Sequence, residues 1–256
     1  MAEVDELQRQ LLASQNRDGG WPFVKGSSWT EPTALALLAL RLHDHSCGAC
    51  QAAAHWLEQR QNPDGGWRPN DTVPTSTWVT SLAILALPNT GAKAGDWLTS
   101  HVYRRTGGSC WFPGTASWVT PTATAILALS RLDSARFAAP IEQNRQFLLN
   151  RRCRDGGWNH GGSSFRSENA VSYPETTGLA LLALAGVPTE HLTTALRLTD
   201  EFLKNPGSIE GLSWLQMGLA ARGRKVEDCE PRFHPRNVRD ISLRLLALAA
   251  LEGRTL

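Results

Sequence analysis

The chain has 256 residues, and 26 Lys and Arg residues against 24 Asp and Glu residues leave a formal net charge of +2. Such a balance argues against a nucleic-acid-binding protein and against a strongly charged tail. We expect a single domain over residues 1–256, which would bury roughly three quarters of its extended-chain surface, so intrinsic disorder and a small disulfide scaffold are excluded.

The sequence offers no targeting or membrane signal. Its start, Met-Ala-Glu-Val-Asp-Glu, lacks the basic and apolar stretches of a secretion signal. Apolar runs such as residues 34–40 are far shorter than the roughly 20 residues that span a bilayer. With five cysteines, an odd number, the chain is expected to be cytoplasmic, with free thiols and no transmembrane segment. Cys47 and Cys50 form a CxxC pair, but no second pair or nearby His completes a zinc site, so ordinary thiols at a helix start are predicted.

A seven-residue motif repeats along the chain. Gln-Asn-Arg-Asp-Gly-Gly-Trp at residues 15–21 returns with small changes at 61–67 and 152–158, and residues 107–111 hold a degraded copy. After the copies come Ala/Leu-rich segments that are apolar on every side, which is typical of a helix buried all round. The segments before the copies are amphipathic instead.

This alternation predicts inner and outer helices in turn, and no segment shows a convincing strand pattern. Outer helices are expected near 3–14, 50–61, 93–104, 140–151 and 190–204, and inner helices near 31–42, 77–87, 120–132, 175–185, 210–222 and 238–251. The last inner helix is as apolar as the others and must be covered, most simply by the first. The predicted fold is therefore all-α: a closed α/α toroid of about six helical hairpins, the last one incomplete, with an irregular strap over 223–237.

The glycine motif has a structural interpretation. Gly19 and Gly20 suit backbone with positive φ at the end of an outer helix. Gln15 and Asp18 can then bond exposed backbone groups while the tryptophan packs into the gap. We predict that the three motif tryptophans are structural: Trp21, Trp67 and Trp158.

These repeats resemble the prenyltransferase and squalene-oxidase repeat, the QW motif of the terpenoid cyclase and protein prenyltransferase superfamily. The resemblance covers nearly the whole chain and is sharpest at 15–21 and 61–67. It implies an α/α toroid whose inner helices begin at a central cavity, and an isoprenoid or other apolar small molecule as the ligand.

In class II terpene cyclases the resemblance implies a DxDDTA motif at such a helix start, whose middle Asp protonates an alkene or epoxide. Laid on this chain through the shared Thr-Ala, the middle acid falls on Glu31, and in later units on Thr120, Glu175 and Arg239, the last followed by Asp240. The flanking acids of the motif are replaced, and a lone Glu lacks the neighbours that make a strong acid. Its structural alternative is a carboxylate in the first helical turn that interacts with the helix dipole.

Of the two acids, Glu175 is the stronger candidate for catalysis. Thr176 and Thr177 beside it carry hydroxyls that can hydrogen-bond a carboxyl group, whereas Pro32 beside Glu31 can donate nothing. Gly178 removes a side chain from the same helix, which would leave room for a ligand.

Aromatic and basic residues also gather near the expected cavity. Trp29, Trp118 and Tyr173 occupy equivalent helix starts, Trp78 is expected one turn deeper, and Trp214 belongs to the fifth inner helix. Their π faces suit an apolar substrate or a cationic intermediate, although aromatics filling the ring centre would fit as well. A basic group, either a diphosphate site or solvated surface charge, comprises Arg222, Arg224, Lys225, Arg232, Arg236 and Arg239.

No metal or other cofactor is predicted. Asp228, Cys229 and His234 include the residue types that hold zinc in protein prenyltransferases, but at the wrong spacing, and the DDxxD of class I terpene synthases is absent. A zinc-dependent protein prenyltransferase is therefore disfavoured.

The sequence thus predicts a terpene cyclase-like enzyme, an isomerase or lyase, with acid-initiated cyclisation or isomerisation at Glu175 or Glu31. Substrate contacts are expected from Trp29, Trp78, Trp118, Tyr173, Trp214 and Arg239. Two alternatives stay open: a non-catalytic toroid that binds a lipid or a protein partner, and a carbohydrate-active toroid with carboxylates facing each other across the cavity. A partner protein is compatible with each of these, and nucleic acid is not expected.

Overall fold

A computed structural model describes residues 2–43, 47–87, 89–102, 105–161, 170–226 and 233–254. These residues form eleven α-helices and one short 3-10 helix, and no β-strand is found among them beyond isolated bridges. The inner helices are α2 (Thr30–Leu42), α4 (Val79–Ala86), α6 (Val119–Asp133), α8 (Pro174–Ala183), α10 (Ile209–Ala220) and α11 (Val238–Leu251). The outer helices are α1 (Ala2–Ala13), α3 (Gly48–Glu58), α5 (Ala92–Ser100), α7 (Ala138–Asn150) and α9 (Thr193–Lys204), the last preceded by η1 (Thr189–Leu192).

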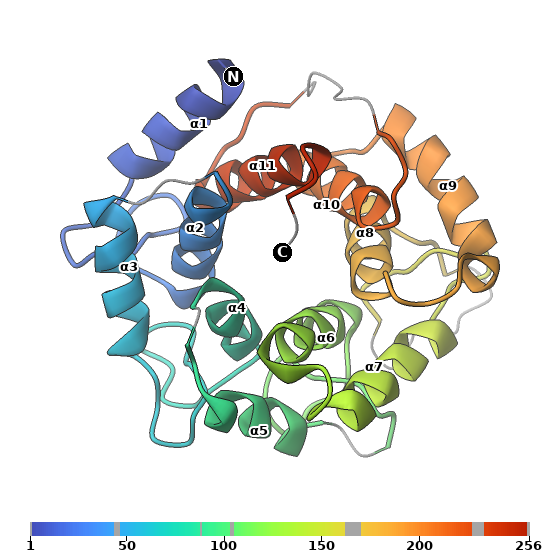
Figure 1. Ribbon diagram of the computed structural model, residues 1–256, viewed down its shortest axis with the longest axis horizontal. Helices are drawn as coiled ribbons and strands as arrows, with labels where there is room; N and C mark the ends of the chain where they lie inside the picture. Colours follow the sequence, from blue (N-terminus) through green and yellow to red (C-terminus); the bar gives the residue numbers. More distant parts are fainter. Residues whose placement is uncertain are drawn as a thin grey trace.

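The inner helices form a closed ring (Figure 1). Each packs on the next, and α11 contacts both α10 and α2, so the predicted closure is confirmed. Because α2 is buried on every side from Pro32 to Leu40, most of its residues there are Ala and Leu. The outer helices bury one face, as α9 does through Ala195, Leu196 and Thr199.

The predicted helices all exist, and their ends differ by a few residues. The largest difference is in α5, which ends at Ser100 rather than near 104. Ser100 and His101 both bond the carbonyl of Trp97, so side chains take an acceptor there that a longer helix would use. No outer helix covers the seam between α10 and α11 within the described parts of the strap, 221–226 and 233–237.

The glycine motif fastens each outer helix to the inner helix that follows it. The buried indole of Trp67 donates to the carbonyl of Leu57 at the end of α3 (2.8 Å), and its backbone N–H donates to Thr80 Oγ1 in α4 (2.8 Å). Trp21 and Trp158 repeat both bonds. In the degraded copy Ser109, not Trp111, takes the place of the tryptophan, because its N–H donates to Thr122 Oγ1.

A second set of bonds links neighbouring units. The carbonyl two residues after each motif tryptophan, or after Ser109, accepts the backbone N–H of an adjacent inner helix start. The pairs are Val238 with Phe23 (2.8 Å), Thr30 with Pro69 (2.8 Å), Trp78 with Trp111 (3.2 Å) and Val119 with His160 (3.0 Å). The corresponding residue of α8 is Pro174, which has no N–H to donate.

Candidate functional site

The starts of the inner helices gather at one end of the ring, because each outer helix returns the chain to the side where its inner helix began. We call this end the N-terminal face. Two residues after each N-cap residue stand Glu31, Thr120, Glu175, Glu210 and Arg239, one on each of five inner helices. The matching residue in α4 is Trp78. It stands two residues before Thr80, which accepts the backbone N–H of the motif tryptophan Trp67.

Arg239 joins three inner helices at this face. Its Nη1 and Nη2 each donate to a Glu210 oxygen (2.5 Å), and its Nε donates to Glu31 Oε1 (2.8 Å). Burial raises the pKa of Glu31, although Arg239 acts in the opposite direction. Burial would lower the pKa of Arg239, but the hydrogen bonds and charges of Glu210 and Glu31 raise it overall. Glu31 is therefore a half-buried carboxyl whose conjugate base is held by a guanidinium.

Glu175 lies in a different setting on α8. Its side chain is 26% exposed, and Oε1 lies 3.8 Å from His160 Nε2. The imidazole of His160 also lies against the ring of Tyr173, with centroids 5.1 Å apart. Among the described residues no arginine forms a salt bridge with Glu175, in contrast to Glu31.

Two of the arguments that favoured Glu175 are wrong. The hydroxyls of Thr176 and Thr177 contact backbone atoms of Trp158 (2.6 Å and 3.3 Å to its carbonyl) rather than the acid. Gly178 leaves no room for a ligand, because a Cβ there would lie 2.3 Å from the backbone of Trp214. The threonines and the glycine therefore serve packing, and the polar side chain that lies near the Glu175 carboxyl is His160.

The aromatic residues are placed as a rim around the N-terminal face. Trp29, Trp118 and Tyr173 are N-cap residues with nearly the same extended backbone, so their predicted equivalence is confirmed. Trp78 also lies at a helix start, against the ring of Trp111 at 4.7 Å, and in the repeat register it stands two residues beyond the position of Trp29 rather than a full turn beyond it.

Trp214 is the exception among the aromatics. It lies one turn beyond Glu210 on the same face of α10 and is 6% exposed, so it closes the ring interior below the acids. Leu35 and Leu179, one turn beyond Glu31 and Glu175, are buried as well. The part of the N-terminal face that a ligand can reach is therefore its rim and first turns.

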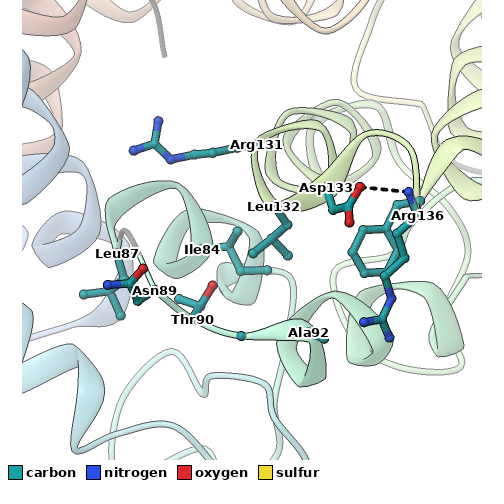
Figure 2. Close-up of a pocket in the computed structure, with 11 residues that line it drawn as sticks. Ile84, Leu87, Asn89, Thr90, Ala92, Arg131, Leu132, Asp133 and Arg136 are labelled. Atoms are coloured by element: carbon teal, nitrogen blue, oxygen red, sulfur yellow. Dashed lines mark hydrogen bonds between the residues drawn. The ribbon is translucent and has the colours of Figure 1, made fainter.

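A hollow of about 540 Å³ at this face lies beside Glu210. Its lining includes Ser208, Ile209, Glu210, Phe233, Arg236 and Asp240, from the starts of α10 and α11. A second hollow of about 270 Å³ lies at the opposite ends of α4 and α6, where Ile84 and Leu132 meet Thr90, Arg131 and Arg136 (Figure 2). None of the predicted site residues lies in that second hollow.

The predicted basic group does not exist as a cluster within the described chain. Arg222 bonds the carbonyls of Leu184 and Val187 beyond the end of α8, and Arg224 pairs with Asp200 on α9. Arg236 and Arg239 lie at the other end of the ring, and Arg232 lies outside the described residues. The prediction relied on closeness in sequence, but Arg222 and Arg224 lie at one end of the ring whereas Arg236 and Arg239 lie at the other.

The alternative metal site lies partly outside the described residues. Asp228 and Cys229 lie outside the described residues, and His234 is exposed beside the 540 Å³ hollow. The described part of the chain holds no group of three or more His, Cys, Asp or Glu side chains that could bind a metal ion.

Two candidate functional residues, Glu210 and His160, were not predicted from the sequence. Glu210 follows its N-cap Ser208 by two residues, as Glu31 and Glu175 follow theirs, but no Thr-Ala follows to mark the register. His160 stands two residues after Trp158, the position of Trp111 and Phe23 in other units, which the repeat alignment could have shown.

Comparison with known proteins gives relatives in both sequence and structure, although no family model matches the chain. It is 30% identical over 168 residues to a drimenyl diphosphate synthase of Streptomyces showdoensis, a match that covers 60% of this chain and 32% of that protein. A drimenyl diphosphate synthase of Streptantibioticus cattleyicolor is 34% identical over 146 residues, a match that covers 50% of this chain and 27% of that protein. The chain thus spans about a third of the length of the curated relatives it matches.

Solved structures with the same fold include terpene cyclases and an amylase. The type II terpene cyclase MstE from Scytonema superposes with a TM-score of 0.67 at 18% identity, over 98% of this chain and 76% of that one. The ent-copalyl diphosphate synthase from Streptomyces platensis superposes with a TM-score of 0.64 at 19% identity, over 87% of this chain and 50% of that one. An α-amylase from Clostridium perfringens superposes with a TM-score of 0.71 at 12% identity, over 97% of both chains.

These findings confirm the α/α toroid and the resemblance to the terpenoid cyclase superfamily. At such low identities the structural likeness shows the fold alone. Within the described residues, no helix has the length and apolar character needed to cross a membrane.

Proposed function

We propose that this chain is a class II terpene cyclase-like toroid that binds a linear isoprenoid at the N-terminal face and starts its cyclisation with Glu175. One observation supports the proposal: Glu31 and Glu175 each stand two residues after an aromatic N-cap residue, in a chain whose sequence relatives include drimenyl diphosphate synthases. The substrate class is supported by MstE, which was solved with geranylgeranyl dihydroxybenzoate as substrate.

In the proposed step, the Glu175 carboxylic acid gives its proton to a terminal alkene carbon, and the C–C π electrons form the new C–H bond. The carbocation that results is stabilised by π faces of the rim, Trp29, Trp78, Trp118 and Tyr173. The imidazole of His160 lies 3.8 Å from Glu175 Oε1 and positions the carboxylate left behind. Loss of a proton from the cyclised cation to solvent, and uptake of a proton by the Glu175 carboxylate, complete the turnover.

Glu31 is the second candidate acid, and Arg239 is a positioning residue for it and for Glu210. Trp214 forms the closed floor under the rim. A protein partner that covers the N-terminal face is also part of the proposal. A reducing, cytoplasmic setting is proposed as well, and it is supported by Cys47, Cys50, Cys110 and Cys153, which form no disulfide among the described residues.

The test incubates the purified chain with farnesyl and geranylgeranyl diphosphate and analyses the dephosphorylated products by gas chromatography and mass spectrometry. Cyclic products are expected, and Glu175→Gln should reduce their rate by at least about 100-fold, the usual contribution of a catalytic acid. Glu201→Gln, an exposed change on α9, is the matched control and should leave the rate unchanged.

Three outcomes contradict parts of the proposal. Equal rates for the parent and Glu175→Gln would overturn the acid assignment. Binding without product, measured by quenching of tryptophan fluorescence, would favour a non-catalytic lipid-binding toroid. Hydrolysis of an α-glucan by the same preparation would favour the carbohydrate-active alternative, whose fold the amylase shares.

A further inference from the structure

Cys47 and Cys50 lie far from the candidate acids, at the opposite end of the ring. They begin α3, next to the end of α2, and their Sγ atoms are 3.8 Å apart. Cys47 is the half-buried N-cap residue, whereas Cys50 lies in the core and is 5% exposed. No feature of the proposed cyclase chemistry uses either thiol.

The backbone between them has the geometry that a disulfide requires. The Cys50 N–H donates to the Cys47 carbonyl (3.0 Å), which closes a four-residue turn whose end Cα atoms lie within about 7 Å. Disulfide-bonded cysteines have Cα separations below about 7 Å. Because the sulfur atoms already face each other, side-chain rotation alone can bring them to bonding distance.

A small molecule can reach both sulfur atoms. A hollow of about 310 Å³ is lined by Cys47 and Cys50 together with Arg41, Gln51, His55 and Glu58. Burial raises the pKa of Cys50 to about 11, so at neutral pH this thiol is the weaker nucleophile of a pair in which Cys47 is the accessible one.

We propose that Cys47 and Cys50 form a thiol–disulfide exchange site for a small-molecule disulfide. The Cys47 thiolate attacks one sulfur of the disulfide RSSR, which forms the mixed disulfide and expels RS⁻. Cys50 then loses its proton to solvent and attacks Cys47 Sγ, so that the Cys47–Cys50 disulfide forms and a second RS⁻ leaves. In balance, two protein thiols are oxidised and one RSSR is reduced to two RSH.

The experiment uses the full chain with Cys229→Ser, reduced and then treated with excess oxidised glutathione. The intact mass should fall by two hydrogen atoms, two reduced glutathione molecules should be released per chain, and peptide mapping should place the disulfide at 47–50. Cys110 and Cys153, both buried, are internal controls and should stay alkylatable. Two free thiols at 47 and 50 after this treatment would overturn the proposal.

Single variants separate the two steps. Cys50→Ser should stop at one glutathione bound to Cys47, and Cys47→Ser should take up none; glutathione on Cys50 of that variant would contradict the assigned order. The parent chain tests the same order without substitution, since alkylation at neutral pH should modify Cys47 before Cys50. In the parent, closure from the mixed disulfide should accelerate about tenfold per pH unit up to about pH 11.

Discussion

Each motif tryptophan is a single residue that joins two helices and fills the gap between them. Trp67 is 1% exposed and uses both of its N–H groups, one toward α3 and one toward α4. Trp67→Ala removes this burial and leaves the Leu57 carbonyl without its donor, so it should lower the free energy of unfolding by about 3–5 kcal/mol. Denaturant unfolding followed by circular dichroism measures the loss.

The control for Trp67→Ala is Phe112→Ala, because Phe112 is 47% exposed and lies outside the core. Its effect should stay within about 0.5 kcal/mol. Equal unfolding midpoints for Trp67→Ala and the parent would show that the motif tryptophans have no structural role.

Asp18 gives the fold an acid-sensitive point. Burial would raise its pKa, but hydrogen bonds from Ser28, Trp56 and Gly20 outweigh burial and hold the pKa below the ordinary 3.8. The unfolded chain therefore binds this proton more readily than the folded chain. The stabilisation is complete above about pH 3.8 and is lost as the pH falls through the lower value of the folded state.

Asp18→Asn should therefore lower the melting temperature at pH 7 and have a smaller effect as the pH falls below 3.8. Thermal melts of parent and variant over this range provide the comparison. A constant difference between the two at every pH would contradict the role given to the carboxylate.

At the scale of elements, α8 and α10 pack backbone against backbone. Gly178 lies against Trp214 and Leu215, and Gly218 lies against the Gly178 carbonyl, so neither position has space for a Cβ. Gly178→Ala should push the two helices apart and destabilise the protein by about 1–3 kcal/mol, which a lower melting temperature would report.

Gly48→Ala is the matched helical control, because a Cβ there meets no atom within 4 Å. This change should be neutral or raise stability by up to about 1 kcal/mol through helix propensity. If both alanine variants melt at the same temperature, the close α8–α10 contact is not the reason for Gly178.

The elements were the part of the fold that the sequence predicted best. Inner helices are apolar all round and outer helices on one face, and this difference depends only on residue type and spacing. The positions of Glu31, Glu175 and Arg239 followed from the same register. The partners of Thr176, the contact at Gly178 and the pairing of Arg239 with Glu210 were out of reach, because they are contacts between units rather than properties of one segment.

For the whole molecule, the first and last helices are joined by a buried arginine. Arg244 of α11 is fully buried, and its guanidinium donates to both oxygens of Glu3 in α1 (2.7 and 2.9 Å) and to Gln216 in α10 (3.1 Å). Glu3→Ala withdraws the carboxylate from a buried charge and should cost about 1–3 kcal/mol in unfolding free energy, as seen by denaturant titration.

Two further variants make this prediction specific. Asp5→Ala removes an exposed acid from the same first turn and should have a much smaller effect. Adding Arg244→Met to Glu3→Ala should restore stability, because an apolar side chain of similar length needs no partner. Failure of the double variant to recover would mean that Arg244 stabilises the ring through its other contacts.

The missing N–H of Pro174 has a consequence for where the ring opens locally. The starts of α2, α4, α6 and α11 each donate a main-chain hydrogen bond to a neighbouring unit, whereas Pro174 at the start of α8 has no N–H to donate. Local opening begins where an element has few hydrogen bonds to its neighbours. Deuterium should therefore enter the first-turn amides of α8, at Glu175 and Thr176, ahead of those at Thr30 and Val238.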